Sequence, residues 1–239
     1  MEPNSARWLL AEYRSCALFS LKASFATSSV GRTTLVPTPY AIKMALVDAG
    51  FRAGLSDSDC NRLLKALAPV TVRISPPDRM VVTNTFVKVR QEPKTPTDEE
   101  PYVSSIAYRE LAYHKGVWLW AFDVAGGSEL ADWIELLAPH ISYIGKRGSF
   151  IQFCGLTRMA ELSTAFTQPL AEGQSWSLSS QAQVLVLDDF GPEADLETLS
   201  SFTKKRAARD RHRRFVETIV PLRSTSTGHG FHEYEVTNL

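Results

Sequence analysis

The order in which strand and helix patterns follow one another limits the fold of this chain more than any single motif does. Alternating stretches within residues 7–25 predict that most of this segment is strand, either long or interrupted, and apolar helix patterns follow at about 39–49 and 57–67. Several β-rich runs come next, then a short helix in ELADWIELLAPHI, and then strands again. This order predicts an α+β fold with antiparallel sheets, and a ferredoxin-like (RRM-like) core fits it.

The entrance to the first helix carries strong local signals. Pro37 and Pro39 favour extended conformations for the residues before them, and Thr38 is a good N-cap with Pro39 at the first helical position. Gly50 is a natural C-terminal stop. The stretch SSVGRTTLVPTPY either is a simple loop into a core helix or lines a site for an anion. The predicted buried face consists of Ala41, Ile42, Met44, Ala45, Leu46 and Val47.

Cap and turn signals place most of the other elements. Ser56 is a candidate cap for the second helix and Ser128 for the third. The β-rich runs VTVRISPP and RMVVTNTFVKVRQ are separated by a predicted turn at 76–78, and a second turn is expected at Lys115-Gly116. QAQVLVLDDF is predicted to be a buried strand. RFVETIVPLR and FHEYEV are predicted to be strands joined by the Gly-rich STSTGHG.

Residues 91–101, QEPKTPTDEEP, contain three prolines and no apolar side chain. Such a segment cannot anchor itself by burying apolar surface, and predicted strands flank it on both sides. We therefore expect a surface loop or the mobile tip of a hairpin rather than a linker between domains.

Composition describes an ordinary globular chain. The 239 residues are 44% hydrophobic and 22% charged, and the 26 basic residues balance 26 acidic ones, so net charge indicates no class of partner. Three cysteines lack metal-ligand spacing, and their odd number disfavours a secreted disulfide framework. The chain contains no apolar run of about 20 residues and no signal-peptide pattern near its start. We expect a soluble, cytoplasmic protein with no membrane partner.

The densest charge feature is KKRAARDRHRR at 204–214, which follows a helix pattern. Such a cluster can neutralise several phosphates of a nucleic acid at once, or it is a solvated helix face or a disordered loop. Its cations, set against the single acid Asp210, are Lys204, Lys205, Arg206, Arg209, Arg211, Arg213 and Arg214.

Three smaller features also fit a nucleic acid. Two glycines bracket Lys146 and Arg147 in GKRGSF, where Phe150 either stacks on a base or packs in the core. In NTFVKVRQ, Lys88 and Arg90 share one strand face with Phe86. TGHG, which contains His229, either presents backbone amides to a phosphate or is a flexible hairpin tip.

Catalytic signatures are poor. The five histidines show no metal-ligand spacing, and no phosphate-binding loop, nucleophile elbow or dinucleotide fingerprint is present, so we predict no metal and no cofactor. Tyr113, His114 and Lys115 are residue types that could cleave RNA without a metal. Adjacent residues of a strand point to opposite faces, which favours a chance cluster.

Several elements together resemble a known family. They are KASFATSSVGRTTLVPTPYAIKMALVDAG, NTFVKVR, SSIAYREL, YIGKRGSFIQF and a Gly-containing C-terminal hairpin. In order along the chain they resemble the RAMP-superfamily subunit of type I CRISPR Cascade complexes that caps the 5′ handle of the guide RNA (crRNA). That resemblance implies a ferredoxin-like core over 1–155 with a thumb hairpin around 80–112. It also implies a C-terminal β-rich region over 156–239, although the two parts are also compatible with one domain.

The resemblance further implies what the chain binds. The implied role is non-catalytic: the chain holds the crRNA 5′ handle, docks the backbone and large subunits of Cascade, and lies close to target DNA. Arg32, Thr33 and Thr34, with Tyr40 behind them, would face the RNA or the adjacent backbone subunit. Two other hypotheses stay open: a metal-independent endoribonuclease that processes precursor crRNA with Tyr113, His114 and Lys115, and an unrelated α+β protein-interaction module.

Overall fold

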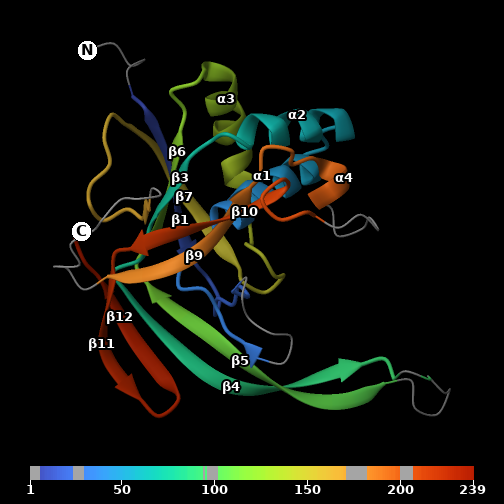
Figure 1. Ribbon diagram of the computed structural model, residues 1–239, viewed down its shortest axis with the longest axis vertical. Helices are drawn as coiled ribbons and strands as arrows, with labels where there is room; N and C mark the ends of the chain where they lie inside the picture. The colour runs from blue at the N-terminus through green and yellow to red at the C-terminus, as the bar shows by residue number, and fades with distance from the viewer. Residues whose placement is uncertain (1–5, 24–29, 94, 96–101, 171–181, 200–206) are drawn as a thin grey trace.

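A four-stranded antiparallel sheet covered by helices forms the centre of the chain. The computed structural model describes residues 6–23, 30–93, 95, 102–170, 182–199 and 207–239. The central strands are β1 (Trp8–Ser15), β3 (Val72–Ser75), β6 (Trp118–Asp123) and β7 (Ile151–Met159), in the order β3-β6-β1-β7. The helices α1 (Pro39–Arg52), α2 (Asp57–Leu67) and α3 (Ser128–Leu137), with the short 3-10 turn Ala138–His140, complete this layer (Figure 1).

The connections make this sheet ferredoxin-like. In chain order a strand, helices, two strands, a helix and a strand give β1, α1 and α2, β3, β6, α3 and β7. Each neighbouring pair is antiparallel, and β1 lies between β6 and β7. This is the split βαβ arrangement predicted from the sequence. The prediction of an α+β fold with antiparallel sheets is confirmed.

A long hairpin interrupts the core between β3 and β6. Its strands β4 (Arg79–Gln91) and β5 (Val103–Lys115) pair over 13 positions and project from the body at the lower right of Figure 1. We call these two strands the thumb. They form a second sheet, ordered β11-β12-β4-β5-β2, with β2 (Val30–Gly31), β11 (Leu222–Gly228) and β12 (Phe231–Val236). Residues 94 and 96–101 of the predicted tip lie outside the described residues, so its mobility stays a prediction.

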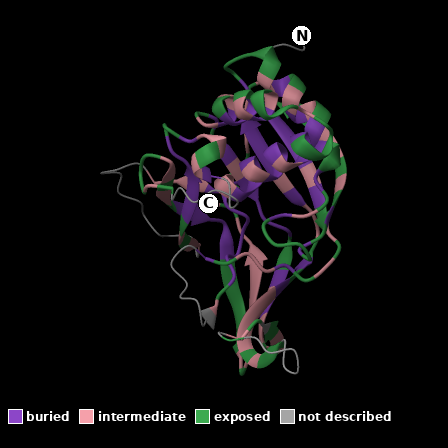
Figure 2. Cartoon of the chain, turned by 90° about the vertical axis from the view of Figure 1, so that its right-hand side faces the viewer, coloured by how far each residue is buried: buried purple, intermediate pink, exposed green. Residues whose placement is uncertain are grey.

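A third sheet packs against α1. It consists of β8 (Gln168–Pro169), β9 (Gln183–Phe190) and β10 (Arg213–Val220), in the order β8-β10-β9, and the short α4 (Leu196–Leu199) lies in the connection between β9 and β10. β7 runs across the division predicted between residues 155 and 156. The C-terminal strands share a sheet with the thumb, and Leu187, Phe190 and Val220 join the same core as the helices. Figure 2 shows that buried residues concentrate in the body.

Both predicted serine and threonine caps at the first two helices are confirmed. The Thr38 side chain accepts from the amide of Ala41, and the Ser56 side chain accepts from the amide of Asp59. The prediction for Ser128 is wrong, because Gly127 is the N-cap of α3 and makes no side-chain hydrogen bond. Caps are local devices, which explains why two of the three could be predicted.

The predicted stop at Gly50 is also wrong. α1 continues to Arg52, and the reversal comes at Gly54, which has φ of +89°. Gly50 instead lets α2 approach closely, because an added Cβ would lie 3.1 Å from the Leu55 side chain and 3.4 Å from Cys60 Sγ. A small residue inside a helix here serves packing rather than termination.

Three predicted strand boundaries differ from the structure. The first strand ends at Ser15, and residues 16–23 make only isolated bridges. RFVETIVPLR divides at Pro221 into β10 and β11, so STSTGHG is mostly strand rather than connection. The predicted turn at Lys115-Gly116 is confirmed, with φ of +110° at Gly116. The strand predicted over QAQVLVLDDF is β9, which begins at Gln183, and only its C-terminal half is buried.

A buried ion pair joins α1 to the third sheet. Lys43, which the apolar pattern of α1 left out, is fully buried, and its Nζ lies 2.7 Å from Asp189 Oδ1 on β9. Asp189 Oδ2 lies 2.9 Å from Nη2 of Arg214, and Oδ1 also accepts the Phe190 amide at 2.7 Å. Burial lowers the pKa of Lys43, and Asp189 acts in the opposite direction. One carboxylate therefore compensates a cation that has no access to water.

This arrangement predicts an asymmetric response to mutation. Asp189→Asn should destabilise the fold by about 3–5 kcal/mol, because it leaves the Lys43 ammonium buried without a counter-charge. Lys43→Met should cost only about 1–2 kcal/mol, since Asp189 keeps Arg214 and the Phe190 amide and the volume is similar. Urea unfolding of both variants measures the difference. Equal losses would contradict this account of the pair.

Candidate nucleic-acid interface

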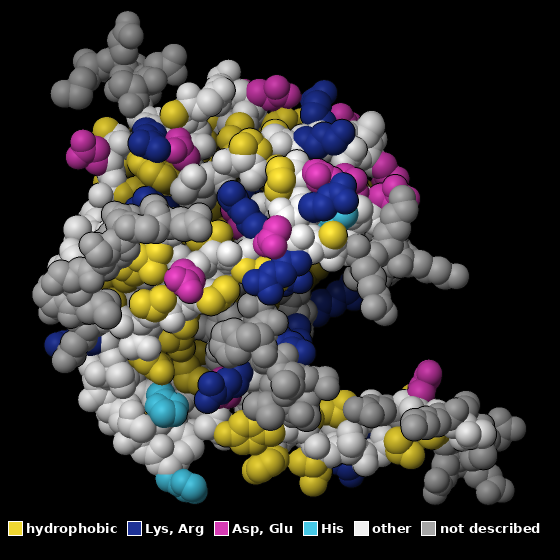
Figure 3. Space-filling view, viewed as in Figure 1, with side chains coloured by type: hydrophobic (Ala, Val, Ile, Leu, Met, Phe, Trp, Pro, Cys, Tyr) yellow, Lys and Arg dark blue, Asp and Glu magenta, His cyan; other side chains and the backbone are white. Residues whose placement is uncertain are grey.

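The thumb and two loops lie at one end of the central sheet. β1 ends at Ser15, which pairs with Ile151 at the start of β7, and Tyr13 pairs with Trp118 at the start of β6. The thumb leaves the body after β3 ends and returns just before β6 begins. The loop that precedes β7 and the base of the thumb therefore lie at the same end. Figure 3 shows the molecule hollowed between the thumb and the body, with Lys and Arg side chains at the inner wall.

One face of the thumb changes from buried to exposed along its length. Near the body, Met80 and Val82 on β4 lie opposite His114 and Ala112 on β5, and all four are buried. Further out, the same register places Phe86 opposite Tyr108. Phe86 is 72% exposed, and its ring lies 5.4 Å from that of Tyr108 in an edge-on arrangement. The core face of the hairpin thus continues beyond the core as a solvent-facing aromatic surface.

Cations lie beside these rings. Lys88 pairs in register with Ile106, and Arg90 pairs with Ser104, so both basic residues share the face of Phe86, as predicted. Lys88 and Arg90 are exposed, and Ile106 is 77% exposed. Within the described part of the chain neither cation makes an ion pair. An exposed Phe86 ring, the half-buried Tyr108 ring beside it and unpaired cations match what single-stranded nucleic acid requires, namely stacking and phosphate neutralisation.

The loop before β7 presents two further cations. Gly145 and Gly148 have φ of +68° and +113°, and Lys146 and Arg147 between them are exposed. An added Cβ at Gly145 would lie 2.4 Å from the Leu21 side chain, so this glycine also allows close packing. Phe150 follows and is 52% exposed, which excludes the alternative that it packs in the core. The loop turns at these two glycines, and the side chains of Lys146, Arg147 and Phe150 face solvent at the thumb end.

The segment Arg32–Thr34 lies at the base of the thumb, but its side chains differ in access. Arg32 is exposed and lies 3.7 Å from Glu110 of β5. Thr33 and Thr34 are buried, and the Thr33 hydroxyl accepts from the Leu21 amide and donates to the Thr34 carbonyl. The expectation that both threonine side chains face an RNA is therefore corrected: of these three side chains, only that of Arg32 reaches solvent.

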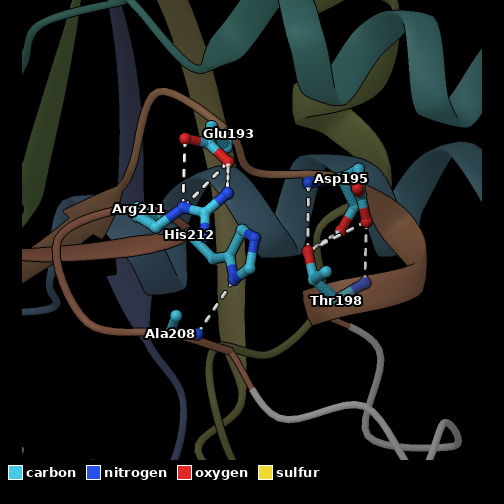
Figure 4. Close-up of polar contacts among 6 residues, drawn as sticks. All are labelled: Glu193, Asp195, Thr198, Ala208, Arg211 and His212. Atoms are coloured by element: carbon cyan, nitrogen blue, oxygen red, sulfur yellow. Dashed lines mark hydrogen bonds and ion pairs between the residues drawn. The ribbon is translucent and has the colours of Figure 1, made fainter.

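Most of the described part of the basic run is neutralised by the chain itself. Arg213 Nε donates to Asp188 at 2.6 Å, Arg214 lies 2.9 Å from Asp189, and Arg211 pairs with Glu193 (Figure 4). Lys204, Lys205 and Arg206 lie outside the described residues. The helix alternative is wrong from residue 207 on, where a turn with φ of +65° at Asp210 leads into β10.

Three more predicted binding residues, Tyr40, Arg209 and His229, have defined surroundings. The Arg213 guanidinium lies 4.4 Å from the centre of the Tyr40 ring, and Tyr40 also packs edge-on against Phe190. This half-buried ring is covered and cannot stack on a base without movement of Arg213. Arg209 is exposed and lies 5.0 Å from the Phe215 ring. His229 is exposed at the turn between β11 and β12, beside Gly230 with φ of +89°.

The Tyr113–His114–Lys115 trio does not form a site. Tyr113 and Lys115 are exposed on one face of β5, whereas His114 is buried on the other. His114 Nδ1 lies 2.9 Å from Ser15 Oγ, which also accepts from Trp118 Nε1 at 3.1 Å. Burial lowers the pKa of His114 to about 3. This imidazole is a neutral core residue. Among the described residues no cluster of three metal-ligating side chains is present.

Sequence comparison provides one informative relative. No protein-family model matches the chain. The chain is 23% identical over 107 residues to the CRISPR-associated protein Cas5 of Archaeoglobus fulgidus, a match that covers 45% of this chain and 47% of that protein. The chain is similar to a Cas5 protein. This finding confirms the resemblance to Cascade subunits that the sequence motifs indicated. The matched region is about half the length of that relative.

Two solved structures are also similar in outline. A CRISPR protein from Archaeoglobus fulgidus is 12% identical with a TM-score of 0.49, over 97% of this chain and 92% of that one. A chain of a CRISPR RNA-guided surveillance complex is 15% identical with a TM-score of 0.45, over 89% and 90% of the two chains. None of the helices in the described ranges is long and apolar enough to cross a membrane.

Sequence reasoning missed two parts of this surface. Ile106 and Tyr108 complete the aromatic face, but they become visible only when the register of β4 and β5 is known. Glu110, which contacts the Arg32–Thr34 segment, was also missed. The period of two along β5 places Ile106, Tyr108 and Glu110 on one face of the strand, but it does not indicate which residues of β4 lie beside them.

The buried His114 predicts how stability depends on pH. Its folded pKa of about 3 lies below the ordinary value of 6.5, so the unfolded chain binds a proton that the folded chain does not. Stability should therefore fall as pH drops from 6.5 toward 3, by up to about 1.4 kcal/mol per pH unit from this group. His114→Phe should flatten the pH dependence of urea unfolding over this range.

His140 provides a matched control, because it is exposed. His140→Phe should leave the dependence of unfolding on pH unchanged. An unchanged dependence in the His114 variant would show that this imidazole titrates normally in the folded chain.

Proposed function

We propose that the chain is a non-catalytic RNA-binding subunit of a Cascade-type CRISPR effector complex. In this role it holds the 5′ handle of the guide RNA and leaves recognition of the target to base pairing by the guide. The observation that carries the proposal is the exposed aromatic and basic face of the thumb, with Phe86 and Tyr108 beside Lys88 and Arg90. Similarity to a Cas5 protein supports the same assignment.

The outer part of the thumb has little to stabilise it in the absence of a ligand. Beyond the residues paired with β2 and β12 it is a two-stranded ribbon, which is marginally stable in water, and it exposes Phe86 and Ile106. A single-stranded RNA laid along this face would cover the rings and receive the cations. Lys146 and Arg147 lie at the same end of the sheet, where they would meet the RNA backbone beyond the thumb.

The partners follow from the same assignment. We infer contacts with the Cascade backbone subunit and the large subunit, and proximity to target DNA. A cytoplasmic location accords with this role. The reading as an unrelated protein-interaction module has no observation in its favour that the RNA-binding proposal does not also explain.

The first test is binding of RNA that co-purifies with the chain. Phe86→Ala should weaken binding by about 1–3 kcal/mol, because one base loses its stacking partner. Lys88→Ala with Arg90→Ala should lower the slope of log affinity against log salt by about 1.4, since each lost phosphate contact contributes about 0.7 on a single strand. Fluorescence anisotropy over a salt series measures both effects.

Two ion-paired arginines far from the thumb face provide the matched control. Arg62 lies beside Glu129 and Arg158 beside Glu135, and both are exposed. Replacing this pair by alanine removes the same charge from elsewhere on the surface. If this control lowers the slope of log affinity against log salt by the same amount, the salt dependence comes from net charge. If the thumb variants bind the RNA as the wild type does, the proposed site is refuted.

The second test separates binding from cleavage. The imidazole of His114 is buried and neutral and shares no face with Tyr113 or Lys115, so the chain should not cleave precursor guide RNA in the presence of EDTA. Incubation of end-labelled precursor with the purified chain, followed by gel analysis, gives the answer. Cleavage that His114→Ala abolishes would establish the endoribonuclease instead.

A further inference from the structure

Glu110 is an acid placed among the cations of the proposed RNA site. Its side chain is on the thumb face that carries Phe86 and Lys88 further out, opposite Asn84 in register. It is only 15% exposed, whereas the neighbouring Arg32 is 65% exposed. A carboxylate repels phosphate, so its position there needs another explanation than RNA contact.

The side chain of Glu110 contacts the segment Arg32–Thr33 through both of its oxygens. Oε2 accepts the backbone amide of Thr33 at 2.9 Å, and Oε1 lies 3.7 Å from Arg32 Nε. The Thr33 hydroxyl in turn accepts from the Leu21 amide at 3.1 Å, and Thr34 donates its amide to the Leu21 carbonyl at 2.8 Å. One carboxylate thus connects the thumb to residues 31–34 and, through them, to Leu21.

Among the described residues, the strand pairing that holds this segment on the thumb is short. β2 pairs with β5 at two positions only, Val30 with Tyr108 and Gly31 with Arg109. The approach at Gly31 is close, because an added Cβ would lie 2.8 Å from the Arg109 side chain and 3.2 Å from the Tyr108 carbonyl. A two-residue parallel pairing is weak by itself, and a hydrogen bond to a partly buried carboxylate adds a stronger constraint.

We propose that Glu110 is a positioning residue that fixes the Gly31–Thr34 segment against the thumb and thereby holds the Arg32 guanidinium where the guide RNA passes. This inference rests on the proposed function. The segment is then ordered before RNA arrives, so less conformational entropy is lost on binding. The effect belongs to the specific RNA, because an unrelated RNA gains nothing from one fixed arginine position.

Positioning and simple electrostatics predict opposite signs. Removing a negative charge from an RNA site should raise affinity for every RNA if charge alone matters. Removing a positioning residue should lower affinity for the specific RNA and leave affinity for a scrambled RNA equal or higher. The ratio of the two affinities therefore separates the two explanations.

The experiment compares three variants with the wild type by anisotropy at fixed salt. The probes are a synthetic copy of the 5′ end of the co-purified RNA and a scrambled sequence of equal length. Glu110→Ala should lower the ratio of specific to scrambled affinity by about tenfold. Glu110→Gln keeps an acceptor for the Thr33 amide and should recover most of the ratio. Glu135→Ala, which removes an equally charged but remote side chain on α3, should leave it unchanged.

Amide exchange provides a readout that does not depend on RNA. The Thr33 amide should be protected in the wild type and in Glu110→Gln, and should exchange faster in Glu110→Ala. A ratio that stays constant or rises in Glu110→Ala, or Thr33 protection that is unchanged, would overturn the proposal. Equal binding of both RNAs by the wild type would refute the proposed function itself, while Thr33 exchange would still report whether Glu110 holds the segment.

Discussion

The Lys43–Asp189 ion pair is the contact on which the arrangement of this molecule depends most. It joins the first helix of the ferredoxin-like core to the strand that begins the C-terminal β region, and Lys43 also donates to the Ala68 carbonyl at the end of α2. The ammonium of Lys43 has no access to water. If β9 moved away while α1 stayed packed, this charge would remain buried without its counter-charge, which is strongly unfavourable. The pair therefore fixes the position of β9, and with it that of β10, its neighbour in the sheet.

The acids on β9 also limit which arginines of the basic run are available to bind a phosphate. Lys43 contacts Oδ1 of Asp189, and Oδ2 of the same carboxylate lies 2.9 Å from Nη2 of Arg214, so this arginine is paired as well. Arg213 likewise makes an ion pair with Asp188, and its guanidinium lies over the Tyr40 ring. In its described part, a run that looks like a phosphate-binding cluster in sequence is therefore largely paired with acids of the chain itself, with Asp188 and Asp189 on β9 and with Glu193. The surface left for a nucleic acid is the one where cations have no partner of their own.

Local and nonlocal information explain what the sequence could predict here. Thr38, Ser56 and the turn at Lys115-Gly116 act within a few residues, so their roles follow from neighbouring residues alone. The period of two along β4 likewise placed Phe86 with the cations that follow it. The burial of Lys43 depends on an aspartate 146 positions away. Neither that pairing nor the register that brings Tyr108 to Phe86 has a signal in the local pattern.

The chain has no formal net charge, yet it presents unpaired cations on part of its surface, because its acids pair with only some of its basic residues. The formal net charge is zero, which argues against nonspecific attraction of nucleic acid as the main source of affinity. In the described residues the acids near the C-terminal strands pair with Arg79, Arg211, Arg213 and Arg214, whereas no ion pair is formed by Lys88 and Arg90 of the thumb or by Lys146 and Arg147 of the loop before β7. In the proposed function, an RNA would be attracted locally and held by stacking and by fixed geometry. A surface of this kind would select an RNA by its path across the thumb rather than by its total charge.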